Sequence, residues 1–259
     1  MTYLPRAAAA TAAEWPDLAV ELDRWEEAGR SARLWWRDDD AVAPTSQLDR
    51  LLSLAGDMPL ALAVIPADAS PALAVALNPS PQIAVLHHGW CHANRATSGK
   101  KSEYPAERHP VDVADELDEG RQRLRSLFGR RALPVFVPPW NRIADRFLPL
   151  LTEIGLTTLS QQAPRKTPLP DGLAALDVHL DVTAWQGDRG FVGTGVALGR
   201  LIAELRQRRA SGDDSAIGIL THHLVMDRAT EDFIAQLFLW TRGLPGARWF
   251  GAGDLLAPP

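Results

Sequence analysis

Short apolar runs alternate with amphipathic segments along this chain. The apolar runs are typical of buried strands, and they span residues 32–37, 60–65, 82–87, 133–137, 156–160, 173–182, 216–222 and 247–250. Between them, apolar residues recur at helical spacing, which predicts helices over 15–29, 46–54, 70–77, 111–127, 144–153, 194–209 and 227–241. Strands that alternate with helices in this way pair in parallel. The pattern therefore predicts an α/β fold, and about seven such units favour a (β/α) barrel over an open sheet.

Nothing in the pattern divides the chain into separate parts. It contains no internal repeat and no low-complexity linker, and its 259 residues are an ordinary length for one α/β barrel. We therefore expect one barrel domain over residues 1–259, with residues 1–30 as an N-terminal helical extension packed on it. The segment 93–110 is polar, irregular and long for a connection, which often marks a functional loop.

The composition argues against several classes of partner. The chain has 32 acidic and 27 basic residues, a net charge of −5, and so lacks the basic surplus that holds a nucleic acid backbone. We see no secretory signal and no run of about 18 apolar residues that could span a membrane. The default expectation is a cytoplasmic protein. Cys91 is the single cysteine, which excludes an internal disulfide.

Polar residues gather directly after five of the predicted strands. They lie at 37–40 (RDDD), 87–92 (HHGWCH), 138–141 (PPWN), 181–185 (DVTAW) and 221–223 (THH). In parallel α/β folds the carboxyl ends of the strands share one face, and functional sites are built there. We therefore expect these five clusters to lie close together.

Two of these clusters predict a metal site. His88 and His92 are four residues apart, and on a helical turn this spacing would direct both rings to one side. An isolated pair of this kind is more often a surface or core feature. Here three consecutive aspartates follow another strand, and they repel one another unless a cation neutralises them. Two imidazoles and one carboxylate form a common site for a divalent metal, with positions left open for water and substrate.

Taken in order, these residues resemble the motifs of the polysaccharide deacetylase family, also called the NodB-homology domain. The matching segments are RDDDA, HGWCH, VPPWN, DVTAW and LTH, and they span roughly residues 33–225. The resemblance implies a distorted (β/α) barrel with about seven strands. It also implies hydrolysis of N-acetyl, and sometimes O-acetyl, groups on sugars, with a divalent metal held by one aspartate and two histidines.

The resemblance assigns roles to particular residues. Asp39 resembles the catalytic base and His222 the general acid, while Asp40, His88 and His92 resemble the metal ligands. A shift of the alignment by one residue would make Asp38 the base and Asp39 the ligand, and His223 is the alternative to His222. The residues that resemble the substrate-binding positions are Pro139, Trp140, Asn141, Asp181 and Trp185.

The chain departs from the family pattern in one position with a chemical role. The family's arginine before the prolines, which pairs with the catalytic aspartate, is Val137 here. Arg37 and Arg142 are the candidates to replace it. Further residues that could support the site are His87 and Asn94, which flank the two histidine ligands, and His179, which lies two residues before Asp181 on an alternating segment.

The predicted function is that of a metal-dependent hydrolase that removes an acyl group, N-acetyl in the first instance, from a small-molecule or carbohydrate substrate. In this reaction a base takes a proton from water that the metal has activated, and an acid protonates the leaving amine. The donor set suits Zn²⁺ and tolerates Co²⁺, Ni²⁺, Mn²⁺ or Fe²⁺. Two alternatives stay open: hydrolysis of another non-peptide C–N bond, such as a formamide or cyclic amide, and a carbohydrate-binding barrel without catalysis. The sequence does not indicate an oligomeric state.

Overall fold

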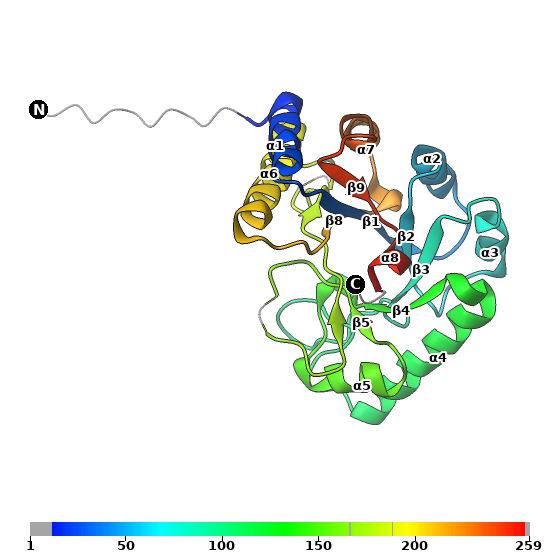
Figure 1. Cartoon of the computed structure of the whole chain (residues 1–259). Coiled ribbons are helices and arrows are strands. Elements are labelled where there is room, and N and C mark those ends of the chain that lie inside the picture. The colour runs from blue at the N-terminus through cyan, green and yellow to red at the C-terminus, as the bar shows by residue number, and fades with distance from the viewer. Residues whose placement is uncertain (1–11, 166, 188, 257–259) are drawn as a thin grey trace, which may run out of the picture.

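All strands of the structure belong to one parallel sheet (Figure 1). The computed structural model describes residues 12–165, 167–187 and 189–256. Within these ranges the strands are β1 (Ala32–Ala41), β2 (Leu60–Val64), β3 (Ile83–His88), β4 (Ala132–Val137), β5 (Thr158–Leu159), β6 (Ala174–Ala175), β7 (Leu180–Asp181), β8 (Ile217–Thr221) and β9 (Ala247–Trp249). Their order in the sheet is β6-β5-β4-β3-β2-β1-β8-β7, and β9 pairs with the start of β1.

The two edges of the sheet are joined by one short run of chain. The alternating segment 173–182 was predicted as a single strand, but it forms β6 at one edge and β7 at the other. Between them, Val178 bridges to Gln162 and the amide of His179 donates to the carbonyl of Gly218 at 2.7 Å. A flat sheet could not be connected at both edges by so short a segment. The sheet therefore curls into a barrel, which confirms the predicted α/β barrel architecture.

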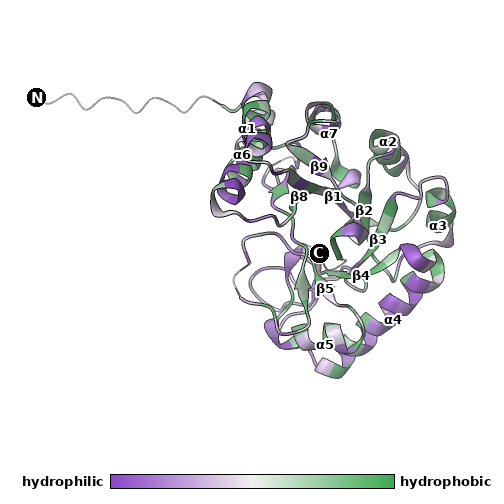
Figure 2. Ribbon diagram, viewed as in Figure 1, coloured by the Kyte–Doolittle hydropathy of each residue, from purple (hydrophilic) through white to green (hydrophobic). Residues whose placement is uncertain are grey.

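Helices surround the sheet (Figure 1). They are α1 (Trp15–Glu27), α2 (Ser46–Ala55), α3 (Pro71–Leu77), α4 (Pro110–Phe128), α5 (Leu148–Glu153), α6 (Thr194–Ser211) and α7 (Arg228–Thr241), close to the predicted ranges. Figure 2 shows hydrophobic strands inside helices with hydrophilic outer surfaces, most clearly in α4. A short additional helix, α8 (Ala252–Leu256), was not predicted, because five residues are too few to show a period.

The strand period of two divides the apolar residues into an inner and an outer core. Trp35 on β1 packs inside the barrel with Leu86 and Leu220, and α8 adds Ala252 to this cluster. The next residue, Trp36, lies on the outer face, where its ring contacts Phe238 of α7 with centroids 5.3 Å apart. Consecutive residues of one strand thus enter different environments, and the same rule governs the polar strand ends described below.

Helix α1 lies against α6 and α7. Its Glu21 is fully buried and forms ion pairs with Arg206 and Arg209 of α6. The expected helical extension over residues 1–30 is described only from residue 12 onward, and its first part lies outside the described residues. None of the helices within the described ranges combines the length and the apolar character needed to cross a membrane.

Candidate metal centre and active site

The carboxyl end of β1 directs Asp40 toward the end of β3. The pairing of β1 with β2 shifts register between Asp38 and Ala41, and Asp40 has a left-handed backbone with φ of 75°. A residue other than glycine is strained in this conformation. The register shift thus interrupts the regular alternation of β1 at Asp40, whose side chain contacts His88 and His92.

Asp40, His88 and His92 form a compact group of possible metal ligands. One ligand atom from each residue lies within 4.8 Å of the other two. His88 Nε2 lies 3.1 Å from Asp40 Oδ1, and His92 Nε2 lies 3.4 Å from the same oxygen. On its other side, His88 Nδ1 lies 3.0 Å from the carbonyl oxygen of Val137. The ring therefore donates through Nδ1 to this carbonyl. Its Nε2 can then donate to the Asp40 carboxylate when the ring is protonated, or bind a cation when the ring is neutral.

The predicted helical turn between the two histidines is wrong. His88 is the last residue of β3, and the chain turns back through Gly89 and His92, which both have left-handed φ angles of 60° and 54°. Glycine adopts such angles without strain. The two rings still meet, with centroids 5.0 Å apart, because the turn reverses the chain directly after the strand.

The donor set fits a divalent cation. Two imidazole nitrogens and one carboxylate oxygen leave coordination positions for water or substrate. The hydrogen bond from His88 to a backbone carbonyl is the kind of support that metal-bound histidines have in proteins. Asp40, His88 and His92 can therefore hold one metal ion, while the donor set alone does not select among Zn²⁺, Co²⁺, Ni²⁺, Mn²⁺ and Fe²⁺.

The surroundings shift the pKa values of these three side chains in different directions. Burial alone would raise the pKa of Asp40, but the hydrogen bond to His88 and the nearby imidazoles hold it well below its usual range. Burial would lower the pKa of His88, yet its bond to Asp40 and the charge of Asp39 raise it above 6.5. The pKa of His92 is lowered by burial and by His88. A metal ion would therefore compete with a proton mainly at His88.

Asp39 faces the inside of the barrel and is paired with an arginine from its own strand. Arg37, which has 0% exposure, donates from Nη2 to Asp39 Oδ2 at 3.0 Å, and its Nε lies 2.8 Å from Oδ1. The guanidinium also donates to Ser160 Oγ at 2.7 Å. Arg142, the other candidate, instead donates to the carbonyl oxygen of Lys101. Arg37 thus supplies the positive charge beside Asp39, which the valine at position 137 cannot supply.

His222 follows β8 and lies across from Asp39. Its Nε2 lies 3.9 Å from Asp39 Oδ2, and no described residue bonds to its buried Nδ1. The indole of Trp185 packs edge-on against the imidazole, with centroids 4.6 Å apart. Asp181 accepts from Trp185 Nε1 at 2.7 Å and from the amide of Thr183 at 2.9 Å. Asp181 therefore positions the indole that covers His222.

Solved structures with this arrangement of strands and helices are found among carbohydrate-active enzymes. A protein from Mycobacterium smegmatis, described as a candidate polysaccharide deacetylase, has a TM-score of 0.64 at 18% identity, over 96% of this chain and 93% of that one. The chain has the polysaccharide deacetylase fold. No protein-family model matches the sequence, and no curated protein matches it.

Two further structures share the polysaccharide deacetylase fold at lower similarity. A CE4 esterase from Streptococcus mutans has a TM-score of 0.55 at 12% identity, over 89% of this chain and 90% of that one. A family 4 acetyl xylan esterase from Clostridium thermocellum, solved with a cobalt ion, has a TM-score of 0.51 at 14% identity, over 86% and 89%. At these identities the likeness concerns the fold, which agrees with the resemblance seen in the motifs.

Asp38 and His223, the alternatives to Asp39 and His222, face the outer side of the sheet. His223 Nδ1 lies 2.5 Å from Asp38 Oδ1, and Thr221 donates its hydroxyl to Asp38 Oδ2 at 2.6 Å. Asp38 and His223 thus bind each other and are not part of the group formed by Asp40, His88 and His92. Burial would lower the pKa of His223, but Asp38 raises it above 6.5, so the two side chains form a buried ion pair behind the site.

The segment after β4 brings Trp140 against His92, one of the three possible metal ligands. Trp140 and Asn141 both have left-handed φ angles, 55° and 57°. The Trp140 ring lies 4.4 Å from that of His92, while Asn141 Oδ1 accepts from Arg37 Nη2 at 3.4 Å. Pro139 is buried beside Gly89, where a Cβ on the glycine would lie 2.4 Å from the proline ring. Trp140 is half-buried, and the ammonium of Lys101 lies 5.9 Å from the centre of its ring.

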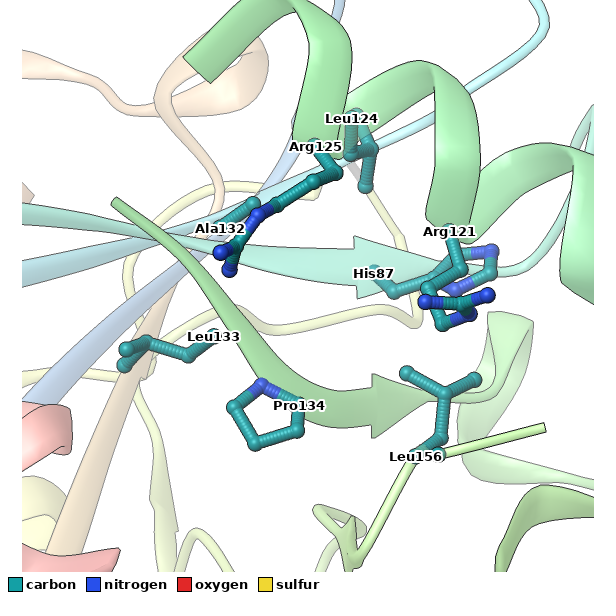
Figure 3. A pocket seen from close by; sticks show the side chains of 9 residues that line it. His87, Arg121, Leu124, Arg125, Ala132, Leu133, Pro134 and Leu156 are labelled. Atoms are coloured by element: carbon teal, nitrogen blue, oxygen red, sulfur yellow. The ribbon is translucent and has the colours of Figure 1, made fainter. Parts of the chain in front are cut away.

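Three residues expected to support the site lie elsewhere. His87 points to the outer face of β3, into a cavity of about 190 Å³ under α4 that Arg121 and Leu124 also line (Figure 3). His179 bonds to Arg208 at 2.8 Å and accepts from the amide of Gly218, near the start of β8 and not at its carboxyl end. Asn94 accepts from the amides of Ala96 and Ser102 and so shapes the loop rather than a ligand. Burial lowers the pKa of His87 to about 3 and that of His179 to about 4, so both rings are neutral.

One residue of the site was not predicted from the sequence. Glu103 is fully buried below the turn that carries His92, and it accepts hydrogen bonds from the amides of Trp90 and Cys91. It lies within the polar segment 93–110, which had been predicted as a functional loop. No motif distinguishes Glu103 from its neighbour Glu107, because burial is decided by how the loop folds back.

Proposed function

We propose that this protein is a metal-dependent hydrolase that removes an acyl group, most simply N-acetyl, from a sugar-type substrate. The observation that supports this proposal is the meeting of three kinds of group at one end of the barrel. Asp40, His88 and His92 offer a metal site, the adjacent Asp39 offers a base, and His222 offers an acid 3.9 Å from that base. Metal-assisted acyl transfer needs all three.

In the proposed mechanism, Asp39 and His222 move the protons. A divalent ion held by Asp40, His88 and His92 would supply Lewis acidity that polarises the acyl oxygen and acidifies water. Asp39 takes a proton as water attacks the acyl carbon, and Arg37 holds this carboxylate in place through two contacts. When the C–N bond breaks, His222 donates a proton to the nitrogen, which leaves as an amine while the acyl group leaves as a carboxylic acid.

Two tryptophans suit a sugar ring as substrate. Trp140 lies against His92, and Trp185 lies against His222 with 47% of its surface exposed. Aromatic faces offer a large apolar surface to the C–H groups of a sugar. The acetyl xylan esterase from Clostridium thermocellum shares the fold and acts, by its name, on an acetylated sugar polymer. This likeness supports an acetylated carbohydrate as the first substrate to test.

The alternative of a barrel that binds carbohydrate without catalysis loses its main support. That reading depended on Val137 in place of the family's arginine, but Arg37 supplies a guanidinium to Asp39 from another position. Hydrolysis of a different C–N bond stays open, because the same groups would cleave a formamide or a cyclic amide. Such compounds therefore belong in the substrate screen.

The proposal is tested by measuring metal content and acyl release on the same preparations. Wild-type protein loaded with Zn²⁺ or Co²⁺ should bind about one ion per chain and release acetate from N-acetylglucosamine oligomers or acetylated xylan, or formate from formamides. The H88A/H92A variant should lose both properties, whereas D39N should keep the ion and lose turnover. Wild-type protein that binds no ion, or D39N with wild-type rates, would contradict the proposal.

A further inference from the structure

Glu103 is a buried carboxylate whose surroundings are unusual for an ordinary core residue. It has 0% exposure and lies in the long connection between β3 and α4. Its Oε1 accepts from the amide of Cys91 at 2.8 Å and from the Cys91 thiol at 3.3 Å, and its Oε2 accepts from the amide of Trp90 at 3.1 Å. Both oxygens accept and neither donates, which is the hydrogen-bond pattern of a carboxylate.

None of the ion pairs among the residues that the structure describes includes this carboxylate. Arg108, the nearest candidate, donates to the carbonyl oxygen of Glu103 at 3.4 Å, while its ion pair is with Glu116 at 2.7 Å. A buried charge that is held by neutral donors alone is costly. The three hydrogen bonds offset part of this cost, and a nearby cation would offset more of it.

The groups that Glu103 binds belong to the turn between the two histidine ligands. Consecutive amides of Trp90 and Cys91 converge on one carboxylate. Gly89, directly before them, has a left-handed φ of 60°, which glycine adopts without strain. The fit is close, since a Cβ on Gly89 would lie 2.1 Å from Glu103 Oε2. The amide of Gly89 donates to the carbonyl of Val137 at 3.1 Å. The turn is thus tied to β4 at its start and to Glu103 at its centre.

We propose that Glu103 is a positioning residue of the metal centre, which holds the turn so that His92 faces His88 and Asp40. This inference rests on the proposed function in so far as the three ligands bind a metal. Glu103 is not one of the three side chains that could hold the metal, and it would act through the backbone of residues 90 and 91. Its charge has a second effect, because the carboxylates of Asp40 and Glu103 together balance one divalent cation, and Asp39 is already balanced by Arg37.

Replacing Glu103 with glutamine removes the charge and leaves the size almost unchanged. The amide has one accepting oxygen, and its NH₂ group would face a backbone N–H, so at least one of the donors loses its partner. E103Q should bind Co²⁺ about 10- to 100-fold more weakly than wild type, the range found for groups that orient metal ligands. E107Q is the matched control, because it makes the same change of charge on an exposed residue four positions away and should bind within about twofold of wild type.

Two further variants separate positioning from misfolding. G89A keeps the carboxylate but forces it from the turn, so it should weaken Co²⁺ binding in the same direction as E103Q. In the H92A variant the imidazole that Glu103 is proposed to position is already absent. E103Q should therefore cost less there than in wild type, and the difference between the two costs measures the coupling of Glu103 to His92. Circular dichroism identifies any variant that is not folded.

Each outcome of the Co²⁺ titration bears on one claim. Weak binding by E103Q and G89A, with normal binding by E107Q and a reduced effect in H92A, supports the assignment. Wild-type affinity in folded E103Q would overturn it and leave the proposed function intact. An equal cost of E103Q with and without His92 would overturn the positioning role in favour of a pure charge effect. Failure of wild-type protein to bind Co²⁺ would instead contradict the proposed function itself.

Discussion

Two neighbouring aspartates of β1 lie on opposite faces of the strand and have different surroundings. Asp39 points into the barrel, where it meets Arg37 and His222 beside the proposed metal ligands. Asp38 points outward and is closed off by His223 and Thr221. The same division separates His222 from His223. A side chain that faces the inside of the barrel can meet a substrate, whereas one between sheet and helices packs against the scaffold. We therefore expect adjacent and chemically identical residues to take different roles.

The largest difference is expected from the two aspartates themselves. D39N removes the proposed base and should lower kcat by about 10²- to 10⁴-fold, the usual contribution of general base catalysis. D38N should leave kcat within about tenfold of wild type, because Asp38 acts through packing and not on substrate. Steady-state rates, normalised to folded protein, compare the two variants. If D38N lost as much kcat as D39N at equal stability, the assignment of faces would be wrong.

His223 should matter for stability more than for turnover. H223A leaves the carboxylate of Asp38 buried without its ion-pair partner, and it should lower the free energy of unfolding by about 3 kcal/mol. The pKa of His223 is raised above 6.5 by Asp38. The pair therefore stabilises the fold fully below pH 6.5, and this contribution is lost as the pH rises through the raised pKa. Urea unfolding of H223A and wild type at a series of pH values measures the difference. A gap that widens with rising pH would contradict this account.

On the inner face, Arg37 is expected to contribute to turnover through its contacts with Asp39. R37K keeps a positive charge but lacks the planar fork that contacts both oxygens of Asp39. Loss of a charged hydrogen bond is worth about 1.5–3 kcal/mol, so kcat should fall about 10- to 100-fold with the bound metal retained. R142K is the control, because Arg142 contacts a carbonyl of the loop. Equal losses in R37K and R142K would show that Arg37 has no special relation to Asp39.

A smaller effect is expected from pH on metal affinity. The pKa of His88 is raised and that of His92 is lowered. As the pH falls through the pKa of His88, one proton competes with the metal, and the affinity should decrease about tenfold per pH unit. Competition titrations of Zn²⁺ between pH 6 and pH 8, about the range where histidine titrates, give this slope. A slope near two would mean that both histidines are protonated without metal.

The period of the strands and the polar strand ends were sufficient to predict the barrel and a cluster of polar residues at one of its ends. Asp40, His88 and His92 were expected as neighbours because parallel strands end on one face, and they are neighbours. The geometry that joins them was not predictable from spacing, since it depends on left-handed residues such as Asp40 and His92. Propensity gives no sign of such angles in residues other than glycine.

Tertiary contacts account for the residues that were misplaced or missed. His87 and His179 resemble site residues in sequence, but the strand period directs His87 outward and Arg208 holds His179 away from the carboxyl end. Glu103 lies 11 residues beyond His92, and its role arises from a loop that folds back on itself. Arg37 was one of two candidates for the missing arginine, and its contacts with Asp39, Ser160 and Asn141 distinguish it from Arg142.

The most direct test of the metal centre is anomalous X-ray scattering from crystals soaked in Zn²⁺. We expect one peak about 2.0–2.2 Å from Asp40 and from the Nε2 atoms of His88 and His92, with Asp39 close to it but still paired with Arg37. No peak at these residues at saturating Zn²⁺, or a peak bound by Asp38 and His223 on the outer face, would contradict the account.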